Sequence, residues 1–208
     1  MNRLILIILL ATSCSHFDPH LRNKAGAITK LCKPPDFYSV AINTPLDIKE
    51  IIHRAFNYWN QVTGKSLLVS AGDDLFHLLP EDGDMFDREA GRVFLVGVYN
   101  DVGSFPPNSE AIGLLRTSKE GCTNSGVILI NPFYLLDNRN TEELESCLRH
   151  EAGHILGLAH NPVFTDLMAL HLEPTLQHPV DASDEEIHLL REWYKEAKPF
   201  NPEWRGHE

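Results

Sequence analysis

The chain has 208 residues, a formal net charge of −11 and a hydrophobic content of 43%. These values are typical of one globular domain with its own core, and the sequence contains neither internal repeats nor low-complexity tracts. The acidic excess argues against nucleic acid as a partner and against adsorption to anionic lipid by charge. We expect a monomer.

The N-terminus has the layout of an export signal. The predicted signal peptide, residues 1–13, begins with positive charge and continues with an apolar run that is shorter than the about 20 residues of a membrane-spanning helix. It ends before Cys14 and resembles a bacterial lipoprotein signal. The resemblance implies a lipid anchor on Cys14 and a place in the bacterial cell envelope, with the outer membrane favoured because Ser15 follows. Residues 14–35 would be a tether; simple secretion is the alternative.

Hydrophobic periodicity predicts five strands and three helices. The strongest strand signal is 92–99, because β-branched and aromatic residues fill it. The last helix opens with Ser183 and Glu186 in the spacing of a capping box. In chain order the predicted elements are strand 37–43, helix 47–62, strand 66–70, strand 92–99, strand 112–117, strand 127–131, helix 141–157 and a helix after Ser183. This order indicates an α+β domain.

The run of residues 150–160 carries the chemistry. His150 and His154 are four residues apart, so on a helix they project from one face and can bind one metal ion. A straight helix would carry His160 away from that face. Gly157 can end the helix in a left-handed conformation without steric cost, after which His160 returns as the third ligand. Three histidines leave a fourth position on one Zn²⁺ ion for water, which is typical of a catalytic site.

The pattern HExxHxxGxxH resembles that of the metzincin zinc endopeptidases, and the matrixin-like branch most closely. That family has a methionine-containing turn (Met-turn) beneath the metal, a role that Met168 fits. The resemblance implies a metzincin-like domain over 36–208 with a mixed, mostly parallel, about five-stranded sheet, a backing helix, a zinc-binding active-site helix and a C-terminal helix. Asn161 departs from the residues that matrixins and adamalysins tend to have there. No tyrosine closely follows the turn, so three histidines and water are the expected ligands.

The implied activity is hydrolysis of peptide bonds in a protein or peptide substrate. Zn²⁺ lowers the pKa of its bound water and polarises the substrate carbonyl, while Glu151 accepts the proton and passes it to the leaving amine. The edge strand at 112–117 would hold an extended peptide by main-chain hydrogen bonds, and residues 161–171 would shape the main side-chain pocket. The alternative is a non-catalytic envelope lipoprotein that keeps a structural zinc and binds a protein in its cleft. The intact Glu151 favours the peptidase.

The cysteines suggest one disulfide in an exported protein. Lipidation of Cys14 leaves three others, and we favour a Cys122–Cys147 disulfide that would brace the zinc helix. The stretch after Cys32 shares proline and aspartate spacing with the matrixin cysteine switch, but it lacks the glycine and leaves little chain to reach the metal. A free or disulfide-bonded structural role is therefore preferred for Cys32.

An acidic stretch between the second and third strands is a candidate calcium site without further support. It lacks an EF-hand pattern, so we favour a solvated loop. The stretch contains Asp73, Asp74, Glu81, Asp82, Asp84 and Asp87.

Overall fold

The structure is a computed structural model that describes residues 20–22, 26–41, 44–72, 93–99, 105, 110–132, 141–170 and 179–201. The predicted signal peptide, the lipidation site Cys14 and the acidic stretch at 73–87 lie outside the described residues. Within the described residues, no helix is both long enough and apolar enough to cross a membrane.

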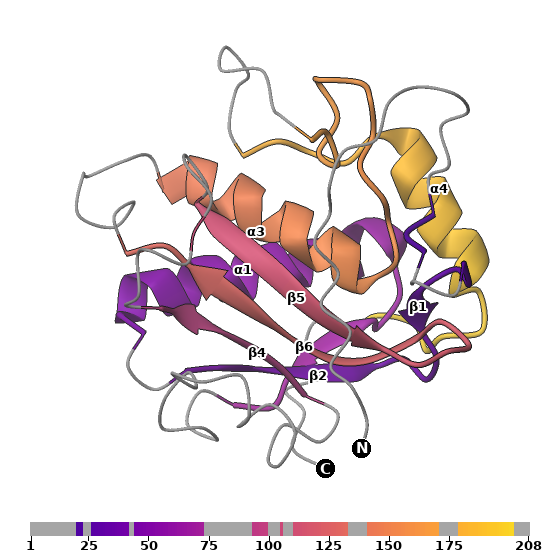
Figure 1. Ribbon diagram of the computed structural model, residues 1–208, viewed down its shortest axis with the longest axis horizontal. Helices are drawn as coiled ribbons and strands as arrows, with labels where there is room; N and C mark the ends of the chain where they lie inside the picture. The colour runs from indigo at the N-terminus through magenta and orange to yellow at the C-terminus, as the bar shows by residue number, and fades with distance from the viewer. Residues whose placement is uncertain are drawn as a thin grey trace.

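A mixed sheet forms one layer of the described fold (Figure 1). Its six strands are β1 (Lys30–Leu31), β2 (Asp36–Val40), β3 (Leu68–Ser70), β4 (Val93–Val98), β5 (Ala111–Thr117) and β6 (Cys122–Ile130). The order β1-β6-β4-β2-β3 is parallel throughout, and β5 pairs antiparallel with β6. The predicted mixed sheet is confirmed, but about five strands was too few.

The sixth strand comes from the segment that the sequence predicts as a tether. Among its described residues, Leu21, Thr29 and Leu31 are buried, and β1 pairs with β6. The fold therefore begins before residue 36. Sequence periodicity could not predict this strand, because two residues are too few to establish an alternating pattern.

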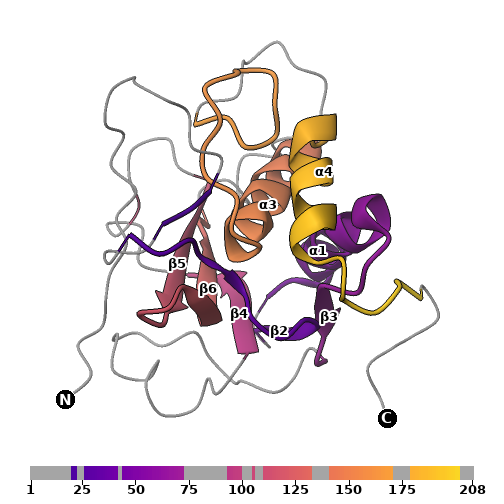
Figure 2. The same cartoon turned by 90° about the vertical axis from the view of Figure 1, so that its right-hand side faces the viewer.

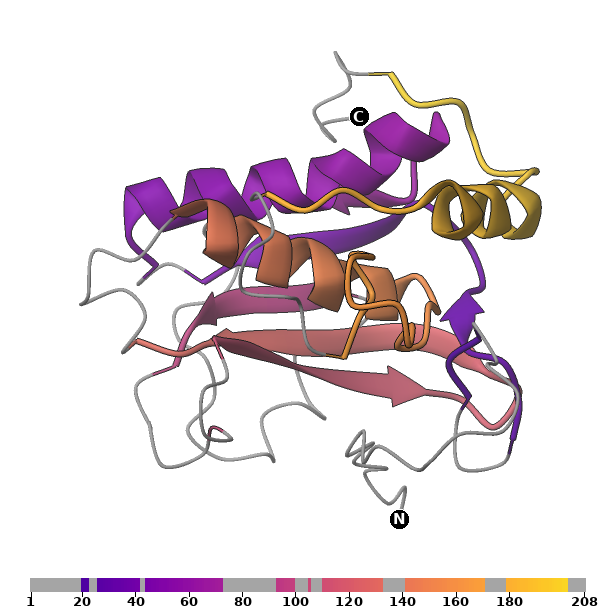
Figure 3. The same ribbon diagram turned by 90° about the horizontal axis from the view of Figure 1, so that it is seen from above.

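Three helices in the described part of the chain lie together on one side of the sheet (Figure 2). They are α1 (Leu46–Thr63), α3 (Thr141–Ile155) and α4 (Asp184–Trp193), and α1 runs beside α3 (Figure 3). α1 buries Phe56 and Trp59 completely and ends at Gly64, whose φ of 70° is left-handed. α4 begins with the predicted capping box, in which Ser183 and Glu186 each accept a hydrogen bond from the other's backbone N–H.

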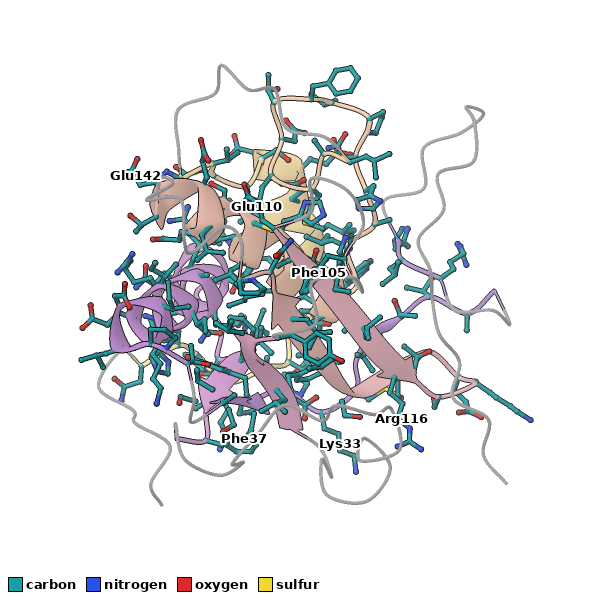
Figure 4. The ribbon with its side chains drawn as sticks, turned by 60° about the vertical axis from the view of Figure 1, so that its left-hand side comes forward. Lys33, Phe37, Phe105, Glu110, Arg116 and Glu142 are labelled. Atoms are coloured by element: carbon teal, nitrogen blue, oxygen red, sulfur yellow. A yellow bond between two sulfur atoms is a disulfide. The ribbon has the colours of Figure 1, made fainter. Side chains whose placement is uncertain are left out.

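Apolar side chains cover both faces of the sheet. Phe94 and Ile128 belong to the main core, which the helices share. Their neighbours Leu95 and Leu129 belong to a second cluster on the opposite face, against which Phe105 packs (Figure 4). Successive strand residues point to opposite faces, so this alternation buries β4 and β6 on both sides. α3 therefore packs against a sheet that is covered on both faces.

The disulfide joins Cys32 to Cys122, with their Cα atoms 5.3 Å apart. The pairing of Cys122 with Cys147 predicted from the sequence is therefore wrong. Cys147 accepts a hydrogen bond from the backbone N–H of Ala111, and Ala111 pairs with Ile130 at the opposite end of β6 from Cys122. Eight residue steps along a strand span roughly 26 Å, far beyond the reach of a disulfide.

Candidate metal centre

Three histidines meet where α3 ends. His150 and His154 project from α3 with ring centroids 4.6 Å apart. Gly157, with φ of 99°, turns the chain after the helix, and the His160 ring returns to 5.2 Å from His150 and 4.7 Å from His154. One ligand nitrogen from each histidine lies within 4.8 Å of the other two. The arrangement predicted from the motif is present.

Backbone carbonyls fix the orientation of two of these rings. Nδ1 of His150 donates to the carbonyl oxygen of Leu167, and Nδ1 of His154 donates to that of Leu158, both at 2.8 Å. Because a carbonyl can only accept, Nδ1 carries the proton in each neutral ring and Nε2 keeps its lone pair. Nε2 of each ring is therefore available as a metal ligand.

The spacing of the nitrogens fits a tetrahedral ion. Nε2 of His154 lies 3.2 Å from Nε2 of His160. Zinc–nitrogen bonds of about 2.0–2.1 Å at tetrahedral angles place two ligand nitrogens roughly 3.3 Å apart. His154 is buried, whereas His150 and His160 are partly exposed, so the centre is open to solvent on one side. The donor set fits one zinc ion with a position left for water or substrate.

The histidines are held in the form that binds metal. Burial, and after it the charge of the neighbouring His160, lowers the pKa of His150 to about 4. Burial, followed by the two neighbouring rings, also lowers the pKa of His154 well below its usual value. Low pKa values keep both imidazoles neutral near pH 7, so no proton has to leave them before a metal binds.

Glu151 lies between α3 and β5. Burial raises the pKa of its carboxyl group to about 8, against the opposing effect of a hydrogen bond from the backbone N–H of Gly113. A Cβ atom at Gly113 would collide with Oε2 of Glu151. Gly113 therefore provides both a hydrogen-bond donor and the space for the carboxylate. Its only sequence signal is a glycine within a predicted strand, which often marks close approach by another group.

Met168 lies directly beneath the metal-binding part of α3. It is fully buried, and a Cβ atom at Gly153 would collide with its sulfur. Its carbonyl oxygen accepts the backbone N–H of Asn161 (2.6 Å), and its own N–H donates to Oε1 of Glu186 (3.2 Å). Met168 therefore packs against the turn of α3 that carries His150 and His154. Sequence reasoning did not find the supporting roles of Gly153 and Glu186.

Asn161, where the chain departs from the family pattern, closes the loop that follows the third histidine. Its side-chain amide donates to Asp166 (2.6 Å), and its Oδ1 accepts the backbone N–H of Val163 (2.9 Å). Asn161 also pairs with Ala169 in an isolated parallel bridge. These bonds fix the loop that presents the Leu167 carbonyl to His150.

A buried ion pair anchors α3 to the rest of the fold. The Arg149 guanidinium contacts Glu145 at 2.7 Å and Asp181 at 2.9 Å, and it lies 4.0 Å from the centre of the Tyr58 ring on α1. The Arg149 carbonyl oxygen accepts the indole N–H of Trp59 at 2.8 Å. These contacts begin one residue before His150 and fix the rotation of α3 about its axis. The histidines therefore face the metal position and not the core.

No family model matches the chain, and no curated protein matches its sequence. Among solved structures, the crystal structure of archaemetzincin from Methanopyrus kandleri is similar, at 16% identity, over 79% of this chain and 99% of that chain, with a TM-score of 0.48. The class defined by the site itself is an α+β protein with three histidines that could hold zinc.

Proposed function

We propose that this protein is a zinc-dependent endopeptidase. The observation that carries the proposal is the meeting of His150, His154 and His160 around one position, with Glu151 directly after His150 on α3. Bound there, zinc would supply a Lewis acid that polarises a carbonyl group and lowers the pKa of water. A site that served only to stabilise the fold would need no carboxyl group beside it.

Glu151 is proposed as the general base and acid. Its pKa of about 8 without metal keeps much of the carboxyl group protonated near pH 7. A cation held by the three histidines would favour the ionised carboxylate, because opposite charges nearby stabilise the charged form. The carboxylate would then accept a proton from the attacking water and return it to the leaving amine. The Gly113 N–H would steady this group beside the reacting bond.

The edge of β5 supports an extended peptide as substrate. In the described part of the chain, β5 pairs with β6 alone. The N–H groups of Ala111 and Gly113 already bond to Cys147 and Glu151 on α3. We therefore propose that a peptide pairs with the part of β5 beyond Gly113, where main-chain bonds give affinity with little sequence preference.

Exposed apolar side chains on the loop after the third histidine support a preference for apolar residues in the substrate. Val163, Phe164 and Leu170 are 48%, 64% and 40% exposed. Exposed apolar groups beside a catalytic centre provide contacts for apolar side chains of a bound peptide. The net negative charge of the chain would not attract a polyanionic substrate.

We also propose that Cys14 carries a lipid anchor that places the protein in a bacterial cell envelope, at the outer membrane, with secretion as the alternative. The support is the N-terminal sequence: a basic start, an apolar run and small residues before the cysteine. Labelling with a radioactive fatty acid, with Cys14→Ala as the control, would test this proposal. Label retained by the variant would contradict it.

The test of the activity uses protein that lacks residues 1–14. It should contain one zinc ion per chain by mass spectrometry and should cleave an unfolded protein substrate at internal bonds. Glu151→Gln should retain zinc and lose cleavage, because the amide cannot accept the proton. Cleavage by this variant would contradict the role of Glu151, and zinc retained without any cleavage by the wild type would favour the non-catalytic binding protein.

A further inference from the structure

The described residues before β1 contact the turn that follows α3. The backbone N–H of Leu21 donates to the carbonyl oxygen of Gly157 (2.8 Å), and His20 pairs with Leu158 in an isolated antiparallel bridge. Leu158 in turn accepts the Nδ1–H of His154 at 2.8 Å. The N-terminal segment is therefore bonded to the same turn that orients a candidate metal ligand.

The carbonyl groups of two successive residues in this segment lie against glycines in two different turns. One turn joins β5 to β6, and the other follows α3. A Cβ atom at Gly121 would collide with the carbonyl oxygen of Ile28, and one at Gly157 would collide with that of Thr29. Thr29 also donates to Leu21 through its N–H (2.7 Å) and its hydroxyl (2.9 Å). Gly157 therefore has a second role: it leaves space for Thr29 in addition to adopting a left-handed conformation.

The far end of the segment is fixed by a tyrosine and by the disulfide. The Leu31 N–H donates to the Tyr194 hydroxyl at 2.9 Å, and this hydroxyl donates to the Leu156 carbonyl at 2.8 Å. The next residue, Cys32, is bonded to Cys122 at the start of β6. Figures 1 and 3 show β1 beside the end of α4. The segment is thus held at both ends.

We propose that residues 20–22 and 26–32, named here the N-terminal clamp, hold the turn that brings His160 to the metal, so that zinc retention depends on this segment and its disulfide. The inference rests on the metal site of the proposed function. Glycine has more backbone freedom than any other residue type. Without further contacts, fixing the turn at Gly157 so that His160 stays in place would therefore have a large entropic cost. Contacts from the clamp remove that freedom before the metal binds.

Leu21→Ala tests the clamp, and Leu67→Ala is its matched control. Both leucines are buried, but Leu67 precedes β3, at the opposite end of the sheet from β1. Zinc affinity would be measured by competition with a chromophoric chelator, at a temperature where circular dichroism shows each variant folded. Loss of an outer contact typically weakens metal binding by about 10- to 100-fold. We expect a loss in that range for Leu21→Ala and less than about a twofold change for Leu67→Ala.

Cobalt binding gives a readout that simple destabilisation would not change. The intense visible absorption of four-coordinate Co²⁺ should appear with the wild type and Leu67→Ala and should weaken with Leu21→Ala, because His160 no longer completes the site. The double variant Cys32→Ser/Cys122→Ser, which lacks the disulfide, should also bind zinc more weakly than the wild type. If Leu21→Ala does not fold, His20→Ala replaces it, since the partly exposed His20 ring lies 4.9 Å from that of Trp193 beside the turn.

The outcomes separate this inference from the proposed function. A wild type that binds no zinc would contradict the metal site, and with it both proposals. A wild type that binds zinc, with clamp variants of unchanged affinity and unchanged cobalt spectrum, would overturn the clamp alone. A wild type that binds zinc but cleaves nothing, with weakened binding in the clamp variants, would support the clamp and contradict the peptidase.

Discussion

The backbone N–H of Met168 donates to Oε1 of Glu186, and Oε2 of the same carboxyl group accepts the N–H of Ser183. One side chain therefore caps α4 and holds the Met-turn. The residue before Met168, Leu167, accepts the Nδ1–H of His150 at 2.8 Å. The start of α4 is thus connected to a candidate metal ligand through two hydrogen bonds and one peptide unit.

Replacing Glu186 should affect both stability and zinc binding. Glu186→Ala leaves the buried N–H of Met168 and the partly buried N–H of Ser183 without their acceptor, which should lower the free energy of unfolding by about 2 kcal/mol. It should also weaken zinc binding, because the Leu167 carbonyl is less well held. Urea denaturation and chelator competition measure the two effects. Glu185→Ala is the control, since Glu185 is exposed in the same helical turn. An equal loss of stability and zinc affinity in Glu185→Ala would show that the effect comes only from removing a negative charge at the start of α4.

Gly153 and Met168 should show strong energetic coupling. In an open helix, Gly153→Ala would stabilise by about 1 kcal/mol, but the collision with the Met168 sulfur should make it destabilising by about 1–3 kcal/mol. Met168→Ala should cost about 2–5 kcal/mol by leaving a cavity. In the double variant, the shorter side chain at position 168 makes room for the new methyl group at position 153. The double variant should therefore lose less free energy of unfolding than the two single variants lose together. Strict additivity in a double-mutant cycle would show that the two residues do not press on each other.

Gly113→Ala should reduce catalysis without removing zinc. The added methyl group occupies the place of the Glu151 carboxylate and should displace it. A displacement of about 1 Å at a reacting group can cost about 100-fold in rate, so we expect a loss of that order in kcat/KM. Leu114→Ala on the same strand is the control for general damage to β5. Zinc lost together with activity in Gly113→Ala would instead indicate that the whole site had been distorted.

Zinc binding should release about one proton at pH 7, and that proton should come from Glu151. Without metal, its pKa of about 8 keeps the carboxyl group mostly protonated, and a nearby cation favours ionisation. His150, with a pKa of about 4, is already neutral and has no proton to release. Calorimetry in buffers of different ionisation enthalpy counts the protons. Glu151→Gln should lower the count by close to one proton, and release undiminished in that variant would assign the proton to another group.

Local sequence was sufficient for much of the fold and for the ligand set. Periodicity predicted α1 and β4 within one or two residues, because each presents an apolar pattern within its own span. The spacing of His150 and His154 required only helical geometry, and the turn at Gly157 required only that glycine tolerates a positive φ. β6 begins five residues earlier than predicted, because its first residues are mostly polar and become a strand by pairing with β5.

The partners of these residues were decided by tertiary structure. Nothing near Cys122 in the sequence indicates that it bonds to Cys32, because the pairing follows from β1 lying beside β6. Nothing near Gly157 indicates that a carbonyl from the N-terminal segment fills the space beside it. Periodicity and spacing involve residues that are close together in the chain, so they can be read directly from the sequence. Contacts between distant segments depend on which surfaces the assembled sheet and helices bring together, and only the folded molecule contains that information.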